Sequence, residues 1–245
     1  MKGRSQEEHD RHALRDELYR RYSSSRAAGA HSFRYRSKII VWVIVVRGAQ
    51  ILKRILDIIF SAAGLIALAP LFATVALLIK LTDRGPVLYW QTRVGLHGRE
   101  FLMPKFRSMV VNAEKVQVGL QGDQPESVRF KMKRDPRITW IGRIIRKFSI
   151  DELPQLWNVL KGQMSLVGPR PPIPKEVREY TVSQRRRLDV IPGLTCIWQV
   201  SGRSDIPFED QVHLDVMYIE SQDFFLDLKL LLKTIPAVLL GKGAY

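Results

Sequence analysis

The stretch Ile58–Ile79 reads IIFSAAGLIALAPLFATVALLI and contains no charged residue in 22 positions. As a single α-helix it would be about 33 Å long, enough to cross a hydrocarbon core of about 30 Å. Pro70 lies near its middle and removes a backbone donor, so we expect a bend or break there. Basic residues flank both ends of the stretch, so the charges favour neither orientation of a simple crossing. A helix that enters one leaflet, bends at Pro70 and returns would keep both basic ends at one surface.

This pattern favours a re-entrant membrane helix over residues 51–80. Two alternatives stay open, a straight span and the buried helix of a soluble protein, although the stretch shows little polar face on any side. Residues 1–50 are expected to form a basic N-terminal arm with a short apolar segment, Ile39–Val46. This arm does not have the pattern of a secretory signal. Whether Ile39–Val46 contacts a membrane stays open.

The composition is typical of a folded protein with a strong attraction to anions. Hydrophobic residues make up 46% and charged residues 26%, which excludes both a mostly disordered chain and a polytopic membrane protein. The 39 Lys and Arg residues against 24 Asp and Glu give a net charge of +15. Such a chain is attracted to nucleic acid, to an acidic bilayer surface or to phosphorylated substrates. The single cysteine, Cys196, excludes an internal disulfide and indicates a reducing compartment.

Beyond residue 80 the sequence predicts a mainly helical α+β domain, without the regular strand–helix alternation of a doubly wound sheet. Short strands are expected at residues 87–90 and 100–103, joined as a hairpin around Gly95. Helices are expected where apolar residues recur at helical spacing. These are residues 140–147, 153–160 and 224–240, the segment between Pro174 and Pro192, and a segment containing Met109, Ala113, Val116 and Leu120.

The candidate catalytic residues lie in the segment Ser149-Ile150-Asp151-Glu152-Leu153-Pro154. Ser149 and Glu152 have the spacing of a capping box, and Asp151 is an alternative N-cap. A carboxylate at a helix N-terminus beside arginines is expected to have a lowered pKa, because the dipole and the cations favour its ionised form. An ionised, fixed carboxylate suits a nucleophile or a Mg²⁺ ligand. The capping role and the chemical role are compatible, and both stay open.

Several basic residues stand beside a glycine or proline that shapes a loop. Together they suggest a phosphate-binding set, because the planar guanidinium group matches phosphate oxygens. The sequence contains no glycine-rich dinucleotide fingerprint and no P-loop, and its five histidines do not have metal-ligand spacing. The basic clusters are Lys105-Phe106-Arg107, Asp135-Pro136-Arg137, Gly168-Pro169-Arg170 and Gly202-Arg203.

In this order, the motifs resemble those of the bacterial sugar transferases, the monotopic polyprenyl-phosphate phosphoglycosyl transferases that start exopolysaccharide and O-antigen assembly. The resemblance covers residues 53–245. It implies a re-entrant helix broken at Pro70 and a cytosolic catalytic domain over residues 81–245, at the bacterial inner membrane. The motifs that carry it are Lys105–Met109, Asp151–Leu156, Met164–Pro171, Pro192–Thr195 and Gln199–Arg203.

The resemblance also implies a reaction. A sugar-1-phosphate would pass from a UDP-sugar to undecaprenyl phosphate, with release of UMP and with Mg²⁺ as cofactor. The matching positions make Asp151 the nucleophile of a phosphosugar–aspartyl intermediate, with Glu152 supporting the metal and the nucleophile. The basic residues expected to bind phosphate are Lys105, Arg107, Arg137, Arg146, Arg170 and Arg203.

Two other functional classes are compatible with the composition. A membrane-bound glycosyltransferase would transfer the sugar alone and release UDP instead of UMP. A membrane-tethered nucleic-acid binder would suit the charge of +15, but the sequence has no recognisable reading motif or stacking platform, so no nucleic-acid partner is expected. An anionic bilayer is an expected partner. The transferred sugar, the glycan pathway and the formation of a homo-oligomer stay open.

Overall fold

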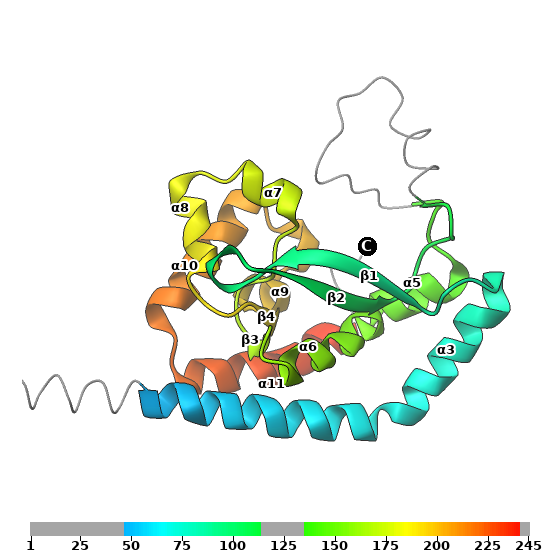
Figure 1. Cartoon of the computed structure of the whole chain (residues 1–245), viewed down its shortest axis with the longest axis horizontal. Helices are drawn as coiled ribbons and strands as arrows, with labels where there is room; N and C mark the ends of the chain where they lie inside the picture. The colour runs from blue at the N-terminus through cyan, green and yellow to red at the C-terminus, as the bar shows by residue number, and fades with distance from the viewer. Residues whose placement is uncertain (1–46, 114–134, 241–245) are drawn as a thin grey trace, which may run out of the picture. The chain divides into compact units, whose positions relative to one another are not determined.

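The computed structural model of the chain describes residues 47–113 and 135–240, apart from the side chain of Ser204. The chain divides into two compact units, Met1–Leu52 and Lys53–Tyr245. In its described part, the second unit is mainly helical with two two-stranded sheets, as the sequence predicts (Figure 1). After the helix Arg47–Ala67 the elements are α3 Ala69–Asp83, β1 Leu88–Val94, η1 Leu96–Gly98, β2 Glu100–Phe106, α5 Trp140–Lys147, η2 Ile150–Gln155, α6 Leu156–Leu160, β3 Ser165–Val167, α7 Pro174–Arg178, α8 Val182–Arg185, η3 Arg186–Leu188, β4 Gly193–Thr195, α9 Ile197–Ser201, η4 Arg203–Asp205, α10 Phe208–Ser221 and α11 Phe224–Leu240, where η marks a 3-10 helix.

The expected break in the apolar stretch lies beside Pro70. The helix Arg47–Ala67 and α3 meet at an angle of 57°. Pro70 is the second residue of α3 and cannot donate to the carbonyl of Ile66, so the ladder of helical hydrogen bonds is interrupted there. The predicted bend is confirmed. No single described helix is long and apolar enough to cross a bilayer, whereas the bent pair taken together meets that test of length and composition.

Polar contacts hold the first helix of the bent pair on the rest of the second unit. The Lys53 ammonium forms an ion pair with the Asp227 carboxylate in α11. Arg54 donates to the last two carbonyl groups of α6, at 2.5 and 2.7 Å. The buried Asp57 carboxylate accepts a hydrogen bond of 3.0 Å from the backbone N–H of Leu166 in β3. The helix is therefore a fixed part of this unit from Lys53 onward.

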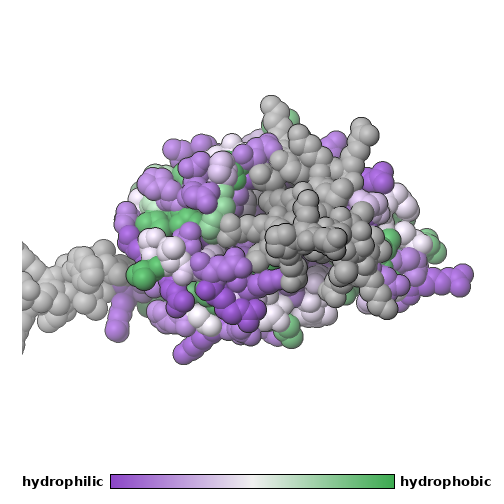
Figure 2. All heavy atoms as spheres, turned by 90° about the horizontal axis from the view of Figure 1, so that it is seen from above, coloured by the Kyte–Doolittle hydropathy of each residue, from purple (hydrophilic) through white to green (hydrophobic). Residues whose placement is uncertain are grey.

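The bent pair and α11 both leave large apolar side chains exposed. Figure 2 shows the opposite face of this unit, on the side away from residues 53–67. The described residues on that face are mainly hydrophilic. The exposed large apolar residues are Ile51, Leu52, Ile55, Ile58, Ile59, Phe60, Ile66, Leu77 and Leu81 in the bent pair, and Phe224, Phe225, Leu228, Leu232, Ile235, Leu239 and Leu240 in α11.

Strands β1 and β2 form the predicted antiparallel hairpin. Tyr89 lies opposite Lys105, and Arg93 lies opposite Phe101. Side chains directly opposite each other in such a pair point to the same face. That face buries Phe101 and Met103 in the core. The same face therefore carries Lys105 and Arg93 along the edge of the core.

The second sheet pairs β3 and β4 in parallel, directly before the loop that carries Arg170. Its end depends on a close approach of two glycines. A Cβ atom on Gly193 would lie 2.0 Å from the backbone nitrogen of Gly168, so neither strand tolerates a side chain there without a backbone shift. Gly168 N donates to Thr195 O at 3.0 Å, and Gly193 N donates to Pro169 O at 2.8 Å. The Arg170 loop therefore starts from a tightly fixed point.

Two groups of buried side chains support these elements. Each large apolar side chain removed from water contributes about 1.5–3 kcal/mol. The main core joins β2, α6, β3, α10 and α11, while the smaller one packs α3 against β2 and α5. The buried residues are Phe101, Met103, Leu156, Val159, Met164, Leu166, Val167, Tyr218 and Leu230 in the first, and Val75, Ile79, Phe106, Ile141 and Ile145 in the second.

The helix predictions are confirmed in part. The expected helices at 140–147 and 224–240 coincide with α5 and α11. The segment 153–160 begins as the 3-10 helix η2 and becomes α-helical only at Leu156. The expected helix containing Met109 is wrong at that residue, because Met109 pairs with Ile138 in an isolated β-bridge. The continuation of that expected helix over Val116 and Leu120 falls outside the described residues.

The single helix expected between Pro174 and Pro192 is wrong. The segment contains α7, α8 and η3, with a break before Thr181. Thr181 starts α8 with a capping box, in which its hydroxyl accepts from Gln184 N and its own N–H donates to the Gln184 side chain. This local cap starts a new helix, so it competes with continuation of the preceding one.

Candidate active site

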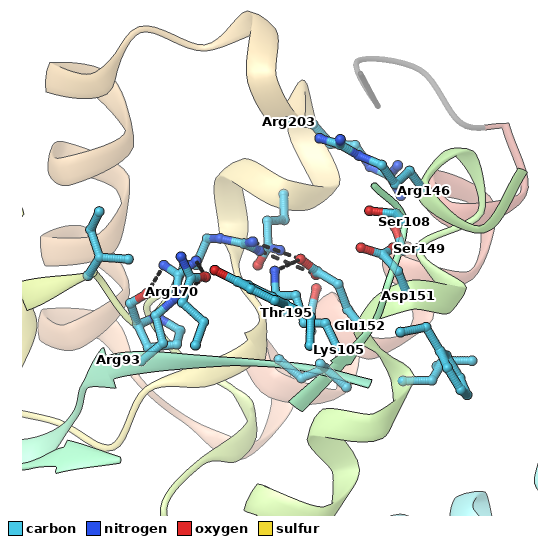
Figure 3. A pocket seen from close by; sticks show the side chains of 18 of the residues that line it. Arg93, Lys105, Ser108, Arg146, Ser149, Asp151, Glu152, Arg170, Thr195 and Arg203 are labelled. Atoms are coloured by element: carbon cyan, nitrogen blue, oxygen red, sulfur yellow. Dashed lines mark hydrogen bonds and ion pairs between the residues drawn. The ribbon is translucent and has the colours of Figure 1, made fainter. Parts of the chain in front are cut away.

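A cavity of about 1100 Å³ lies between the hairpin, η2, the loop after β3, α9 and α11. The structure brings every site residue that the sequence predicts, except Pro70 at the helix bend, to the lining of this one cavity. In Figure 3, basic side chains surround the two adjacent carboxylates of η2. The predicted residues in the lining are Asp151, Glu152, Lys105, Arg107, Arg137, Arg146, Arg170 and Arg203.

Glu152 is held by two cations from different elements. Lys105 Nζ of β2 donates to Glu152 Oε1 at 2.9 Å, and Arg170 Nη2 donates to the same oxygen at 2.7 Å. Burial opposes the ionised form of Glu152, but Arg170 and Lys105 outweigh it and hold its pKa well below the usual range. Burial lowers the pKa of Lys105 to about 8, against the opposing effect of Glu152. Glu152 is therefore a fixed anion over the whole neutral range.

Asp151 stands beside this ion-paired carboxylate in a different state. Within the described residues, the Asp151 carboxylate forms no hydrogen bond and no ion pair. Burial raises its pKa to about 6, and the neighbouring charge of Glu152 adds to the rise. Lys105, Arg146 and Arg170 act in the opposite direction and do not cancel these two effects. The expected lowering of the Asp151 pKa is therefore wrong, because burial and Glu152 outweigh the cations.

Neither capping interpretation of this segment holds. Ser149 precedes η2, but its side chain accepts no capping hydrogen bond and its φ of 53° lies in the left-handed region. A non-glycine residue in this region stores strain of about 1–3 kcal/mol, and such residues cluster at functional sites. Asp151 lies inside η2 and not at its N-cap. The carboxylates of Asp151 and Glu152 are thus not used to cap a helix.

Two of the predicted arginines present their charge to the cavity. Arg146 comes from α5 and Arg203 begins η4, with a left-handed φ of 54°. Neither forms an ion pair with a carboxylate of the described chain. Burial lowers the pKa of the Arg203 guanidinium, and the charges of Glu152 and Asp151 oppose that change. Both side chains are available to an anion that enters the cavity.

Besides Arg170, two further predicted arginines already hold acidic partners. Arg107 is buried and forms an ion pair with Asp83 at the end of α3, so it ties the hairpin to the bent helix pair. Arg137 is buried and pairs with Asp135 of its own turn, with Arg137 Nη2 and Asp135 Oδ2 at 2.6 Å. Each of these guanidinium groups would bind a phosphate only in addition to its carboxylate.

The two carboxylates form a plausible donor set for a divalent cation. Mg²⁺ in phosphate-transfer sites uses one or two carboxylates and completes its shell with water and substrate phosphates. Asp151 is unpaired, and Glu152 Oε2 has one long contact of 3.3 Å with Arg170 Nη1. Within the described residues, no group of three or more acidic, histidine or cysteine side chains forms a metal site. The pair therefore fits an ion that arrives with a diphosphate.

Comparison with known proteins is consistent with this cluster of carboxylates and cations. The sequence profile described as "Bacterial sugar transferase" matches residues 48–241. The chain belongs to the bacterial sugar transferase family. This match covers the bent helix pair and all the cavity residues, so the family shown by the comparison is the one that the sequence motifs resemble.

Individual relatives of the bacterial sugar transferase family are also similar to this chain. The galactosyl transferase CpsE of Streptococcus agalactiae serotype III is 47% identical over 196 residues, which are 79% of this chain and 43% of CpsE. The undecaprenyl-phosphate galactose phosphotransferase of Salmonella typhimurium is 45% identical over 205 residues, 81% of this chain and 43% of that protein. The exopolysaccharide production protein ExoY of Sinorhizobium fredii is 40% identical over 198 residues, 79% of this chain and 88% of ExoY. The chain thus spans less than half the length of the first two relatives.

In this family member, Arg93 is a charged cavity residue that the sequence did not predict. Arg93 of β1 lines the cavity and donates to Gln91 Oε1 at 2.6 Å and to Pro171 O at 2.8 Å. Burial and the charge of Arg170 lower its pKa to about 10. Because Arg93 holds the residue that follows Arg170, it helps to position that loop. The alternation of the hairpin, which places Arg93 on the same face as Lys105, was the available signal.

Proposed function

We propose that the chain transfers a sugar-1-phosphate from a UDP-sugar to undecaprenyl phosphate through a covalent intermediate on Asp151. The observation that carries this proposal is the unpaired Asp151 carboxylate, next to an ion-paired Glu152 in a cavity lined by basic residues. The printed names of relatives support the reaction class, because one is an undecaprenyl-phosphate galactose phosphotransferase and another an undecaprenyl-phosphate glucose phosphotransferase. The ExoY similarity supports a role in exopolysaccharide production.

In the first step, a carboxylate oxygen of Asp151 attacks the phosphorus that bears the sugar. A new Asp151 O–P bond forms, and the bond from that phosphorus to the bridging oxygen breaks. UMP leaves with the electron pair, and the sugar phosphate remains as an aspartyl ester. Attack requires the ionised carboxylate, which exists above the Asp151 pKa of about 6.

The basic residues bind and orient the two phosphate groups of the donor. Arg146 and Arg203 have no carboxylate partner among the described residues, so they are suited to the phosphoryl oxygens. Phosphoryl transfer depends mainly on positioning and charge stabilisation, which such groups supply. Lys105 and Arg170 hold Glu152 ionised, which keeps one negative charge fixed beside the nucleophile.

Asp151 and Glu152 are the residues that would hold Mg²⁺. The ion would neutralise charge on the diphosphate, which makes UMP a better leaving group. Glu152 is the more suitable permanent ligand, because Asp151 must keep an oxygen for attack.

In the second step, an oxygen of the lipid phosphate attacks the same phosphorus. The Asp151 O–P bond breaks, the carboxylate is regenerated and a diphosphate links the sugar to the lipid. The nucleotide has already left, so the two anionic substrates need not occupy the site together. This order avoids the repulsion between a nucleotide diphosphate and a lipid phosphate.

The lipid acceptor requires a site near a bilayer surface. The 57° bend beside Pro70 and the exposed apolar residues of the bent pair support a re-entrant insertion, with the catalytic unit in the cytosol at the bacterial inner membrane. The net charge of +15 would then favour a surface of anionic headgroups. Cysteines introduced at Leu56 and at Thr82 should both be labelled from the cytosolic side only. Labelling of one of them from outside would mean a full crossing.

The decisive experiment identifies the nucleotide product and the covalent adduct. Purified protein with a UDP-sugar labelled in the sugar should release UMP and retain label on Asp151. Asp151→Asn should lose at least about 10³-fold of the rate of UMP release and form no adduct, because an amide is a poor nucleophile. The exposed Asp189→Asn is the matched control and should behave as the wild type. Release of UDP would identify a glycosyltransferase, and an active Asp151→Asn would exclude this nucleophile.

A further inference from the structure

The cavity has one wall that the proposed chemistry does not use. Helix α11 contributes Leu231, Thr234, Ala237 and Val238 to the lining. Leu231, Thr234 and Val238 are separated by three and four positions, and Ala237 follows Thr234 by three, so the four residues form one stripe along the helix. Leu194 and Val200 add further apolar side chains to the same cavity. The cavity thus combines the charged groups around Asp151 with an apolar wall on α11.

The apolar surface of α11 continues from the cavity to the exterior. Leu228, Leu232, Ile235 and Leu239 also follow helical spacing, and each is between 44% and 66% exposed. Leu231, in the cavity stripe, is four residues before Ile235, so these two side chains are neighbours on the helix surface. An apolar chain can therefore pass from the cavity over Leu231 and Ile235 without meeting a charged side chain. Lys233 lies between them in the sequence but points to another side of the helix.

This wall is fixed in position and offers few polar groups to a ligand. The Thr234 hydroxyl is hydrogen-bonded to the Thr195 hydroxyl at 2.8 Å and to Leu230 O at 2.7 Å. Leu230, four residues before Thr234 on the same side of the helix, is buried in the main core and anchors α11 there. A nucleoside or a sugar buried here would leave its hydrogen-bonding groups without partners, which is unfavourable. A hydrocarbon chain has no such requirement.

We propose that the α11 wall, formed by Leu231, Thr234, Ala237 and Val238, binds the first isoprene units of the polyprenyl phosphate acceptor. This inference rests on the proposed function. The lipid phosphate lies among the cations near Asp151, the first isoprene units lie along the wall, and the chain leaves over Ile235 toward the bilayer. The volume of about 1100 Å³ exceeds the usual range of about 300–1,000 Å³ for a ligand pocket, so the headgroup and part of the chain both fit.

The test separates the two half-reactions. Ala237→Phe fills the wall and should raise the KM for undecaprenyl phosphate about tenfold or more. UMP release without acceptor should stay within about twofold of the wild type, which also shows that the variant is folded. Discharge of the adduct by methyl phosphate, which has no isoprenoid chain, should also be unchanged. Met217→Phe, at an exposed apolar residue of α10 outside the cavity lining, is the control and should leave the KM and both rates unchanged.

Two outcomes of the kinetic test would overturn the inference. One is an unchanged KM for undecaprenyl phosphate in Ala237→Phe. The other is a slower UMP release or a higher KM for the UDP-sugar in a variant whose unfolding transition matches the wild type, because the wall would then bind the nucleotide or the sugar.

A binding measurement distinguishes failure of this inference from failure of the proposed function. A photoreactive polyprenyl phosphate in nanodiscs should label the peptide that contains residues 231–238 in the wild type and much less in Ala237→Phe. This readout does not require turnover. If label appears there but UMP is never released, the reaction is wrong and the lipid site stands. Labelling only at other segments, with normal UMP release, would mean that the lipid site is wrong.

Discussion

Glu152 in the cavity and Asp215 in α10 are both paired with arginine, yet their pKa values move in opposite directions. Glu152 contacts Lys105 at 2.9 Å and Arg170 at 2.7 Å, and its side chain is 17% exposed. Asp215 is fully buried and pairs with the buried Arg187 at 2.7 Å. Neither carboxylate oxygen of Asp215 accepts a well-aligned hydrogen bond. The two regions therefore differ in the number of cations and in access to water.

These differences determine the sign of each pKa change. Burial raises the pKa of Asp215 to about 6, because the single charge of Arg187 does not offset the lost hydration. Burial acts in the same direction on Glu152, but its two cations outweigh it and its pKa is lowered. The sign of a carboxyl group's pKa change therefore depends on its direct cationic contacts weighed against its burial, and not on the number of basic residues nearby. The Asp215–Arg187 pair joins α10 to η3 behind the cavity, which Arg187 lines, whereas the two pairs of Glu152 keep a charge beside Asp151.

The largest expected effect is on stability, at the buried pair. Asp215→Ala leaves Arg187 buried without a counter-charge and should lower the free energy of unfolding by about 3–5 kcal/mol. Guanidinium denaturation measures this change. Glu220→Ala, which breaks the exposed pair of Arg186 and Glu220, is the control and should cost less than about 1 kcal/mol. Equal losses in the two variants would contradict the comparison.

The next effect is on the rate, at the cavity pairs. Arg170→Ala removes one of the two cations on Glu152 and should slow UMP release about 100-fold, which corresponds to about 2.7 kcal/mol. Rapid-quench measurement of UMP release without acceptor gives this rate directly. Arg143→Ala removes an exposed arginine of α5 that does not line the cavity, and it should leave the rate unchanged. A similar loss in both variants would mean that only the overall charge matters.

The smallest expected effect is the pH dependence of UMP release. In the proposed mechanism only the ionised Asp151 attacks, so the rate should fall as pH decreases through about 6 and approach a tenfold loss per pH unit, or about 1.4 kcal/mol. In Arg170→Ala the acid limb should move to higher pH, since Arg170 lowers the pKa of Asp151. A pH–rate profile from 5 to 8 tests both statements. A rate that stays constant down to pH 5 would contradict the assignment of a raised pKa to Asp151.

Some parts of this molecule were predictable from the sequence because their cause is local. Regular apolar spacing predicts α5 and α11 with their observed bounds, and Pro70 predicts the bend. The order of the motifs predicts that residues as distant as Lys105 and Arg203 serve one site, and both line the cavity. This expectation comes from the resemblance to the sugar transferase family, because apolar spacing alone does not indicate which loops meet.

Other parts depend on tertiary structure and were not predictable. The pKa of Asp151 depends on its burial and on the approach of Glu152, neither of which is visible in Ser149–Pro154. The role of Arg93 depends on the carbonyl of Pro171, which lies 78 positions further along the chain. The break before Thr181 had a local signal, the capping box with Gln184, but the apolar spacing on both sides of it suggested a continuous helix.

The contacts of the first helix bear on how this protein can be handled in the laboratory. A truncated version that starts at α3, made to obtain a water-soluble fragment, would lack Lys53, Arg54 and Asp57. Asp227, the final carbonyls of α6 and the N–H of Leu166 would then lose their partners, and the strand that leads to the Arg170 loop would be the first to loosen. Expression of the chain with the whole bent helix pair is therefore the route to an intact catalytic centre.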